Sequence, residues 1–160
     1  MMNDQLFQFS TPTERQILIT RHFDAKRRDV FEAWTNPAQV SRWWDPSGKP
    51  LAICEIDLKL QGCFRWVNQA AQGAGHAFVG HYQEIVPPER LVFTTRTFSD
   101  GPESVTTLLF VETEGKTKLT MTIECGSREA RDALLKMRVD VGTAQTLENL
   151  AEFLKRNADR

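Results

Sequence analysis

The sequence has few cysteines and no long apolar segment. Its 160 residues contain three cysteines, Cys54, Cys63 and Cys125, which form no CxxC pair. Because an odd number argues against a disulfide framework, we expect reduced, buried thiols. No apolar run approaches the roughly 20 residues that span a bilayer. The first residues also lack the apolar stretch of a signal peptide, so the default expectation is a cytoplasmic protein with no membrane span.

An excess of charge of one sign is also absent. Lys and Arg number 20 and Asp and Glu number 21, which leaves a formal net charge of −1. This balance provides no overall attraction to nucleic acid or anionic lipid. The run Lys26-Arg27-Arg28 is flanked by Asp24 and Asp29, which favours a solvated helix face. We therefore expect no nucleic-acid partner.

Motifs of metal and covalent chemistry are missing as well. His76 and His81 are separated by an odd step, so on one strand they point to opposite faces. No cysteine or carboxylate cluster has zinc spacing, and no G-x-S-x-G or cysteine-nucleophile motif occurs. Gly73 and Gly75 suit a hairpin turn better than a dinucleotide fingerprint. We expect no metal, no cofactor and no assigned catalytic residue.

The N-terminal part predicts a loose leader over residues 1–13, followed by a single domain over residues 14–157. Alternation from Arg15 to Phe23 indicates a strand. Asp24 is expected to cap a first short helix. Asn36-Pro37 then starts a second short helix, because asparagine suits the cap position and the missing N–H of proline has no partner at the first helical position.

The middle of the chain is a series of strands separated by turn residues, including Glu114-Gly115. Short connections between them favour an antiparallel meander. The expected strands are Leu51–Leu58, Cys63–Asn68, Ala77–Val86, Arg90–Phe98, Val105–Glu112 and Thr117–Cys125.

The last segment changes to helical periodicity. The spacing predicts one helix from about residue 128 to residue 156, with Ser127 at its cap. Gly142 lies in its middle and costs about 1 kcal/mol relative to alanine. A close helix–sheet approach, or a ligand against bare backbone, would account for a glycine at this position.

One long helix and two short ones cannot fill the concavity of a curved sheet of about six to seven strands, so we expect an internal cavity.

Several stretches in this order carry a family resemblance. They are Arg21–Ala25, Val30–Pro37, Trp43–Pro46, Gly62–Trp66, Gly80–Phe93, and Gly142 with Gln145–Leu150. The chain resembles the START-like SRPBCC superfamily, in particular the homologues of the activator of the heat-shock-protein-90 ATPase. The resemblance implies an α+β helix-grip fold (START-like, Bet v-like), in which an antiparallel sheet wraps around the C-terminal helix. It implies no single activity.

The chain departs from the family pattern at three places. Lys26 stands where the family usually has proline, and Thr143 stands where it favours tryptophan. Thr95 or Thr97 stands where it often has a bulky aromatic residue. Loss of aromatic bulk at such places is expected to enlarge or reshape the pocket.

The resemblance places several aromatic residues on cavity walls, although each also fits an ordinary core position. They are Trp44, Phe64, Trp66, Phe78 and Phe93. Met121 and Met137 suit a pocket because methionine adapts to varied shapes, and Val141 of the final helix joins this set. His76, Tyr82 and Arg96 are the polar candidates, with Arg65 behind them; each also fits a surface or structural role. Arg96 would meet a ligand carboxylate through a bidentate pair.

Three functional hypotheses follow. The leading one is a non-catalytic protein that binds a small apolar or amphipathic molecule in its cavity. The second is a cyclase- or hydrolase-type enzyme that uses His76, Tyr82 or Arg96 to polarise a carbonyl group. The third is a chaperone-regulating interaction module.

The segment Thr107–Val111 is apolar on both strand faces, which would suit a homodimer contact.

Overall fold

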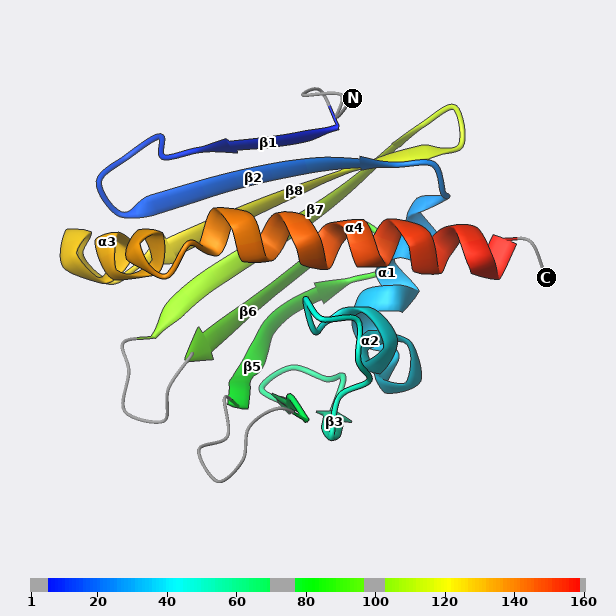
Figure 1. The fold of residues 1–160 in the computed structure, drawn as a ribbon, viewed down its shortest axis with the longest axis horizontal. Coiled ribbons are helices and arrows are strands. Elements are labelled where there is room, and N and C mark those ends of the chain that lie inside the picture. Colours follow the sequence, from blue (N-terminus) through cyan, green and yellow to red (C-terminus); the bar gives the residue numbers. More distant parts are fainter. Residues whose placement is uncertain (1–5, 70–76, 97–102, 159–160) are drawn as a thin grey trace.

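A computed structural model describes residues 6–69, 77–96 and 103–158. Their strands form one eight-stranded antiparallel sheet in the order β1-β2-β8-β7-β6-β5-β4-β3 (Figure 1). The strands are β1 (Phe7–Ser10), β2 (Gln16–Phe23), β3 (Ile53–Ile56), β4 (Cys63–Val67), β5 (Ala77–Val86), β6 (Arg90–Arg96), β7 (Ser104–Thr113) and β8 (Lys116–Cys125). The helices are α1 (Arg27–Thr35), α2 (Pro37–Trp43), α3 (Arg128–Lys136) and α4 (Val139–Ala158).

The helix-grip fold is confirmed, with one strand or two more than expected. Helix α4 runs along the sheet, and α1 and α2 pack at one end of it (Figure 1). The core lies between the sheet and these helices, and Leu147, Leu150 and Phe153 are the buried face of α4. No helix in the described part of the chain is long and apolar enough to cross a bilayer.

The extra strand is β1, which lies inside the segment expected to be a loose leader. It pairs antiparallel with β2, with Phe7 opposite Arg21 and Ser10 opposite Leu18. Phe7 and Phe9 alternate with polar residues and pack against the core. This period of two provides the apolar face that the expectation of a loose leader overlooked.

The two short helices begin differently from one another. Asp24 does not cap α1; the backbone N–H of Arg27 instead donates a hydrogen bond of 2.9 Å to Glu112 Oε1 of β7. This carboxylate comes from 85 residues away, so local sequence signals do not reveal it. Asn36 caps α2 as expected, because its side-chain oxygen accepts a hydrogen bond of 3.0 Å from the Ala38 N–H.

The C-terminal helix is broken, which corrects the expectation of one continuous helix. α3 ends at Lys136, and Arg138 has a left-handed φ of 58° before α4 begins at Val139. The Arg138 Nε and Nη2 atoms each donate a 3.2 Å hydrogen bond to the Asp140 carboxylate. Arginine normally favours a helix, so residue propensities do not predict this break. The ion pair between Arg138 and Asp140 accompanies it.

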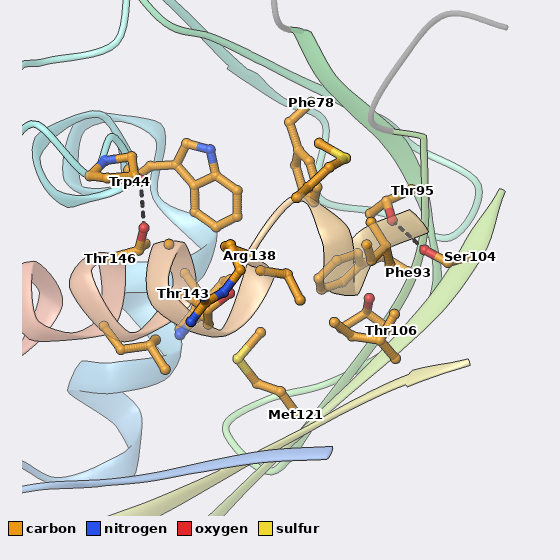
Figure 2. A pocket seen from close by; sticks show the side chains of 18 of the residues that line it. Trp44, Phe78, Phe93, Thr95, Ser104, Thr106, Met121, Arg138, Thr143 and Thr146 are labelled. Atoms are coloured by element: carbon orange, nitrogen blue, oxygen red, sulfur yellow. Dashed lines mark hydrogen bonds between the residues drawn. The ribbon is translucent and has the colours of Figure 1, made fainter. Parts of the chain in front are cut away.

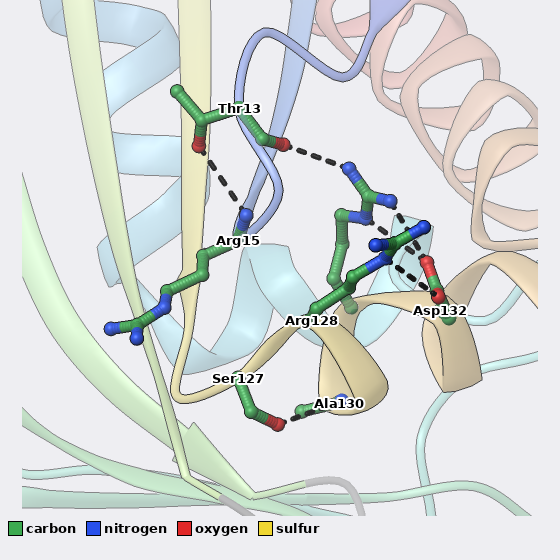
Figure 3. Close-up of polar contacts among 7 residues, drawn as sticks. Thr13, Arg15, Ser127, Arg128, Ala130 and Asp132 are labelled. Atoms are coloured by element: carbon green, nitrogen blue, oxygen red, sulfur yellow. Dashed lines mark hydrogen bonds and ion pairs between the residues drawn. The ribbon is translucent and has the colours of Figure 1, made fainter.

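Helix α3 has no fully buried residue; Ala130, Leu134 and Leu135 pack partly buried against the core, and polar contacts add to this attachment (Figure 3). Ser127 caps it as expected, by accepting a 3.1 Å hydrogen bond from the Ala130 N–H. Arg131 Nη1 donates to the Thr13 carbonyl oxygen at 2.8 Å, which ties α3 to the loop between β1 and β2. By contrast, α4 carries the ion pair between Glu148 and the buried Arg21 of β2, at 2.8 Å.

Candidate ligand-binding cavity

A cavity of about 400 Å³ lies between the concave face of the sheet and the start of α4. This volume lies in the range of small-molecule sites in proteins. Strands β5 to β8 form one wall, and α1, α2 and the junction of α3 with α4 form the other. The apolar part of the lining consists mainly of Trp34, Trp44, Phe78, Phe93, Met121, Ile123, Leu134, Val139 and Leu147 (Figure 2).

Short hydroxylated side chains line the centre of the sheet wall. Thr95 of β6 pairs with Ser104 of β7, and their hydroxyl oxygens are 2.9 Å apart. One step further along the same face, Phe93 pairs with Thr106. Because the hydroxyls of Thr95 and Ser104 bond to each other, this polar strip is partly satisfied without a ligand (Figure 2). The short side chains leave room above the sheet.

The helix wall is also built from small residues. Gly142, Thr143 and Thr146 of α4 line the cavity. A Cβ atom added at Gly142 would meet nothing within 4 Å, so this glycine does not serve a close helix–sheet approach. The Thr146 hydroxyl donates a 3.2 Å hydrogen bond to the Trp44 carbonyl oxygen, which leaves its methyl group to the lining. Gly142 therefore adds open space to the interior.

The junction of α3 and α4 forms one edge of the cavity. Met137 and Arg138 both line it and are both largely exposed, Met137 at 52%. Arg138 is the only charged residue in the lining that the structure describes. Hydrogen bonding to Arg138 holds the pKa of the Asp140 carboxyl below its usual value, which keeps this ion pair charged.

An aromatic cluster fills the space next to the cavity. We define it as Trp34, Trp43, Trp44, Phe64, Trp66, Phe78 and Tyr82. Ring centroids are 4.6 Å apart for Trp44 and Trp66 and 4.8 Å apart for Trp44 and Phe78. These tilted and edge-to-face contacts are the arrangements that aromatic rings prefer. Trp34, Trp44 and Phe78 belong to both the cluster and the cavity wall, so they separate the filled region from the hollow one.

Burial leaves polar groups of this cluster without partners and keeps its acids protonated. Trp34 Nε1, Trp66 Nε1 and Tyr82 Oη make no hydrogen bond to the described residues. Burial raises the pKa of the Tyr82 hydroxyl well above its usual range, and the neighbouring Cys54 adds to the shift. Burial likewise raises the pKa of the Cys54 thiol to about 11. Neither group supplies an anion near neutral pH.

The structure divides the predicted ligand-binding residues into groups. Trp44, Phe78, Phe93, Met121 and Met137 line the cavity. Phe64, Trp66 and Tyr82 belong to the aromatic cluster behind its wall and do not line it. His76 lies outside the described residues. The binding roles of all these residues remain predictions.

Arg96 and Val141 do not belong to the cavity lining. Arg96 follows Thr95 on β6 and therefore points to the convex side of the sheet, where its Nε atom lies 3.7 Å from Glu103 Oε2. Arg65 and His81 share that side, so the predicted carboxylate pairing of Arg96 inside the cavity is not supported. Val141 is 55% exposed, one position before the inward-facing Gly142.

Sequence reasoning missed the other lining residues, although simple spacing identifies some of them. Steps of two from Phe93 reach Thr95, and steps of two from Ser104 reach Thr106. On α4, helical steps from Gly142 and Thr143 reach Thr146 and Leu147. The missed residues are Trp34, Pro46, Asn68, Ser104, Thr106, Ile123, Leu134, Arg138, Val139, Thr146 and Leu147.

The single antiparallel sheet and the C-terminal helix that packs along it define the START-like helix-grip class. Within that class, the family model of Activator of Hsp90 ATPase homolog 1-like proteins matches residues 24–155. The chain therefore belongs to this family.

Solved structures of bacterial proteins have the same fold. The chain is similar to a protein of Rhodobacter sphaeroides, with 25% identity, a TM-score of 0.85, and 94% of this chain and 98% of that chain covered. A protein of Nitrosomonas europaea is 21% identical with a TM-score of 0.83, covering 94% and 100%. CalU16 of Micromonospora echinospora is 23% identical with a TM-score of 0.65, covering 96% and 87%. No curated protein matches the sequence.

Proposed function

We propose that this protein binds a small apolar or amphipathic molecule in the cavity between the sheet and α4, and that it does not convert this molecule chemically. The observation that carries the proposal is the cavity of about 400 Å³, lined mainly by aromatic and aliphatic side chains. Removing such surface from water is favourable for an apolar ligand, at about 25 cal/mol per Å². The fold class hosts several activities, so the lining rather than the fold supports the proposal.

The chemical character of the lining favours binding over catalysis. Within the described part of the chain, no carboxylate, imidazole or thiol lines the cavity. Of the residues considered for carbonyl polarisation, Tyr82 lies behind the wall and Arg96 lies on the convex side. General acid–base catalysis requires a group within hydrogen-bond reach of the reacting atom. The polar side chains of the described lining are hydroxyls, the carboxamide of Asn68 and the guanidinium of Arg138.

A cavity-filling substitution tests the proposal. In Thr143→Trp, the indole occupies the space that the family often fills, and we expect the variant to lose affinity for N-phenyl-naphthylamine, a neutral apolar fluorescent probe. The matched control is Glu152→Trp, which places the same ring on an exposed position of α4. Binding is measured by fluorescence titration, and folding is checked by circular dichroism.

The outcome separates a cavity site from surface adsorption. We expect wild-type protein and Glu152→Trp to bind the probe alike and to melt at higher temperature in its presence, because a ligand that binds only the folded state stabilises it. A folded Thr143→Trp variant that binds the probe as tightly as wild type would refute the cavity site. Native mass spectrometry of protein purified from its own host then identifies a resident ligand.

Family membership supports one further candidate, a chaperone-related role. The family is described by its likeness to an activator of the Hsp90 ATPase. If this chain acts in that way, adding it to a bacterial Hsp90 homologue raises the ATPase rate, and the Thr143→Trp substitution leaves that effect unchanged. An unchanged ATPase rate over a range of protein ratios argues against this candidate.

A further inference from the structure

Arg138 combines three features that no other lining residue in the described chain has. It carries the only charge in the lining, it lies at an exposed edge of the cavity, and its backbone is left-handed. Its side chain is 67% exposed, whereas that of Asp140 is 34% exposed. A positive charge thus lies where the apolar interior meets water (Figure 2).

The contacts of the guanidinium leave part of it available. Its Nε and one Nη2 hydrogen point at the two oxygens of Asp140, at 3.2 Å each. A guanidinium has five N–H donors in a planar fork, so the edge formed by Nη1 and Nη2 makes no hydrogen bond within the described structure. This edge has the geometry that recognises a carboxylate in a bidentate manner.

We infer that the ligand is amphipathic and anionic at one end, with its apolar body in the cavity and a carboxylate-like group on Arg138. The inference rests on the proposed function and specifies its ligand class. Asp140 orients the guanidinium, and its negative charge also weakens the attraction for a second anion. The two residues together thus set the strength of headgroup recognition.

Two probes of equal chain length, decanoate and decanol, separate headgroup recognition from apolar binding. Calorimetric titration at mildly alkaline pH and low salt is expected to show that wild-type protein prefers decanoate by about fivefold, since a largely exposed charge pair contributes modestly. Arg138→Met is expected to remove this preference, because it weakens the binding of decanoate but not that of decanol. The matched control, Arg128→Met, changes an exposed arginine of α3 outside the lining and retains the preference.

A second variant moves the result in the opposite direction. Asp140→Asn removes the competing carboxylate, so it is expected to increase the preference for decanoate severalfold without changing decanol binding. A residue with a merely structural role would shift both probes alike. Added salt lowers the preference in wild-type protein, because screening weakens interactions between exposed charges.

The possible failures are distinguishable. Equal affinity of wild-type protein for the two probes, or a preference that survives in Arg138→Met, overturns the anionic-ligand inference while the proposed cavity function stands. If wild-type protein binds neither probe and also does not bind N-phenyl-naphthylamine, both proposals fail. If it binds the neutral naphthylamine but neither alkyl probe, the inference alone is refuted.

Discussion

The aromatic cluster and the cavity occupy neighbouring parts of the same concave sheet surface, but only one of them is filled. In the cluster, rings from β4 and β5 meet rings from α1 and α2, and Trp44 is within 5 Å of both Trp66 and Phe78. In the cavity, Thr95 and Thr106 of the sheet face Gly142 and Thr143 of the helix. Large rings thus meet across the cluster, whereas small residues interrupt the otherwise large apolar lining on both walls of the cavity.

This contrast refines the sequence argument for a cavity. Too few helices over too broad a sheet would leave space throughout the interior, not in one region alone. The structure shows that the interior is filled where aromatic side chains of β4 and β5 meet those of α1, α2 and Trp44. The small residues on both walls contribute to the hollow. Truncating a ring in the cluster should therefore lower stability, and enlarging a small cavity residue should reduce ligand binding.

The largest expected effect is on the filled side. Trp66 is 2% exposed, so Trp66→Ala leaves a void and is expected to lower the free energy of unfolding by about 3–5 kcal/mol. Met137→Ala, at the exposed edge of the cavity, is the control and should change it by less than about 0.5 kcal/mol. Urea denaturation measures both. Similar losses in the two variants would contradict the contrast between the regions.

Two glycines provide a sharper comparison of the same kind. A Cβ atom at Gly80 of β5 would lie 1.8 Å from the Thr94 carbonyl oxygen and 2.7 Å from Phe64 Cζ. Gly80→Ala is therefore expected to destabilise the fold by about 1–3 kcal/mol. Gly142→Ala meets open space and should instead stabilise it by about 1 kcal/mol through helix propensity. Thermal unfolding of both variants checks the opposite signs; equal signs would refute the assignment of free space.

The smallest effect concerns alkaline pH. In the unfolded chain the Cys54 thiol ionises near its ordinary pKa of 9.0, whereas the folded chain keeps it protonated until about 11. Between these values the unfolded state binds fewer protons, so the free energy of unfolding falls as pH rises. Because the thiol is only half-buried, we expect a loss of about 1 kcal/mol.

Denaturation curves across that pH range test this expectation. Cys54→Val should flatten the fall, and Cys63→Ser, which changes an exposed cysteine, should not. Part of the fall remains in Cys54→Val, since the pKa of Tyr82 is raised in the same direction. An unchanged pH profile in Cys54→Val would exclude Cys54 as the cause.

Much of the fold could be predicted from the sequence because the signals for its strands and helix caps are local. Alternation and turn residues placed β2 and β4 to β8 within about two residues of their bounds, and Asn36 and Ser127 act as the caps expected of them. The break between α3 and α4 at Arg138 could not be predicted, since methionine and arginine are common residues in helices. The start of α1 depends on Glu112, a contact across the fold.

The candidate site was predicted only in part, for a related reason. The departures at Thr95 and Thr143 pointed to a widened pocket, and both residues line the cavity. Strand parity around Arg96 was uncertain because β7 is apolar on both faces, so the wrong side of β6 was considered for ligand contact. Four-residue steps from Leu134 through Arg138 to Gly142 and Thr146 follow one helix face, so helical spacing placed Arg138 on the lining side, although it did not predict the break there.

Asn36 serves two helices at once, and this sets a limit on chain length at that corner. Its N–H donates a 2.8 Å hydrogen bond to the Glu32 carbonyl oxygen at the end of α1, while its side chain caps α2. Asn36 is thus the only residue between α1, which carries Trp34, and α2, which carries Trp43. Inserting one residue here would put the N–H that closes α1 and the side chain that caps α2 on different residues, and would displace Trp34 relative to Trp43. Relatives that keep the tryptophans should therefore tolerate insertions in the hairpin turns but not at this corner.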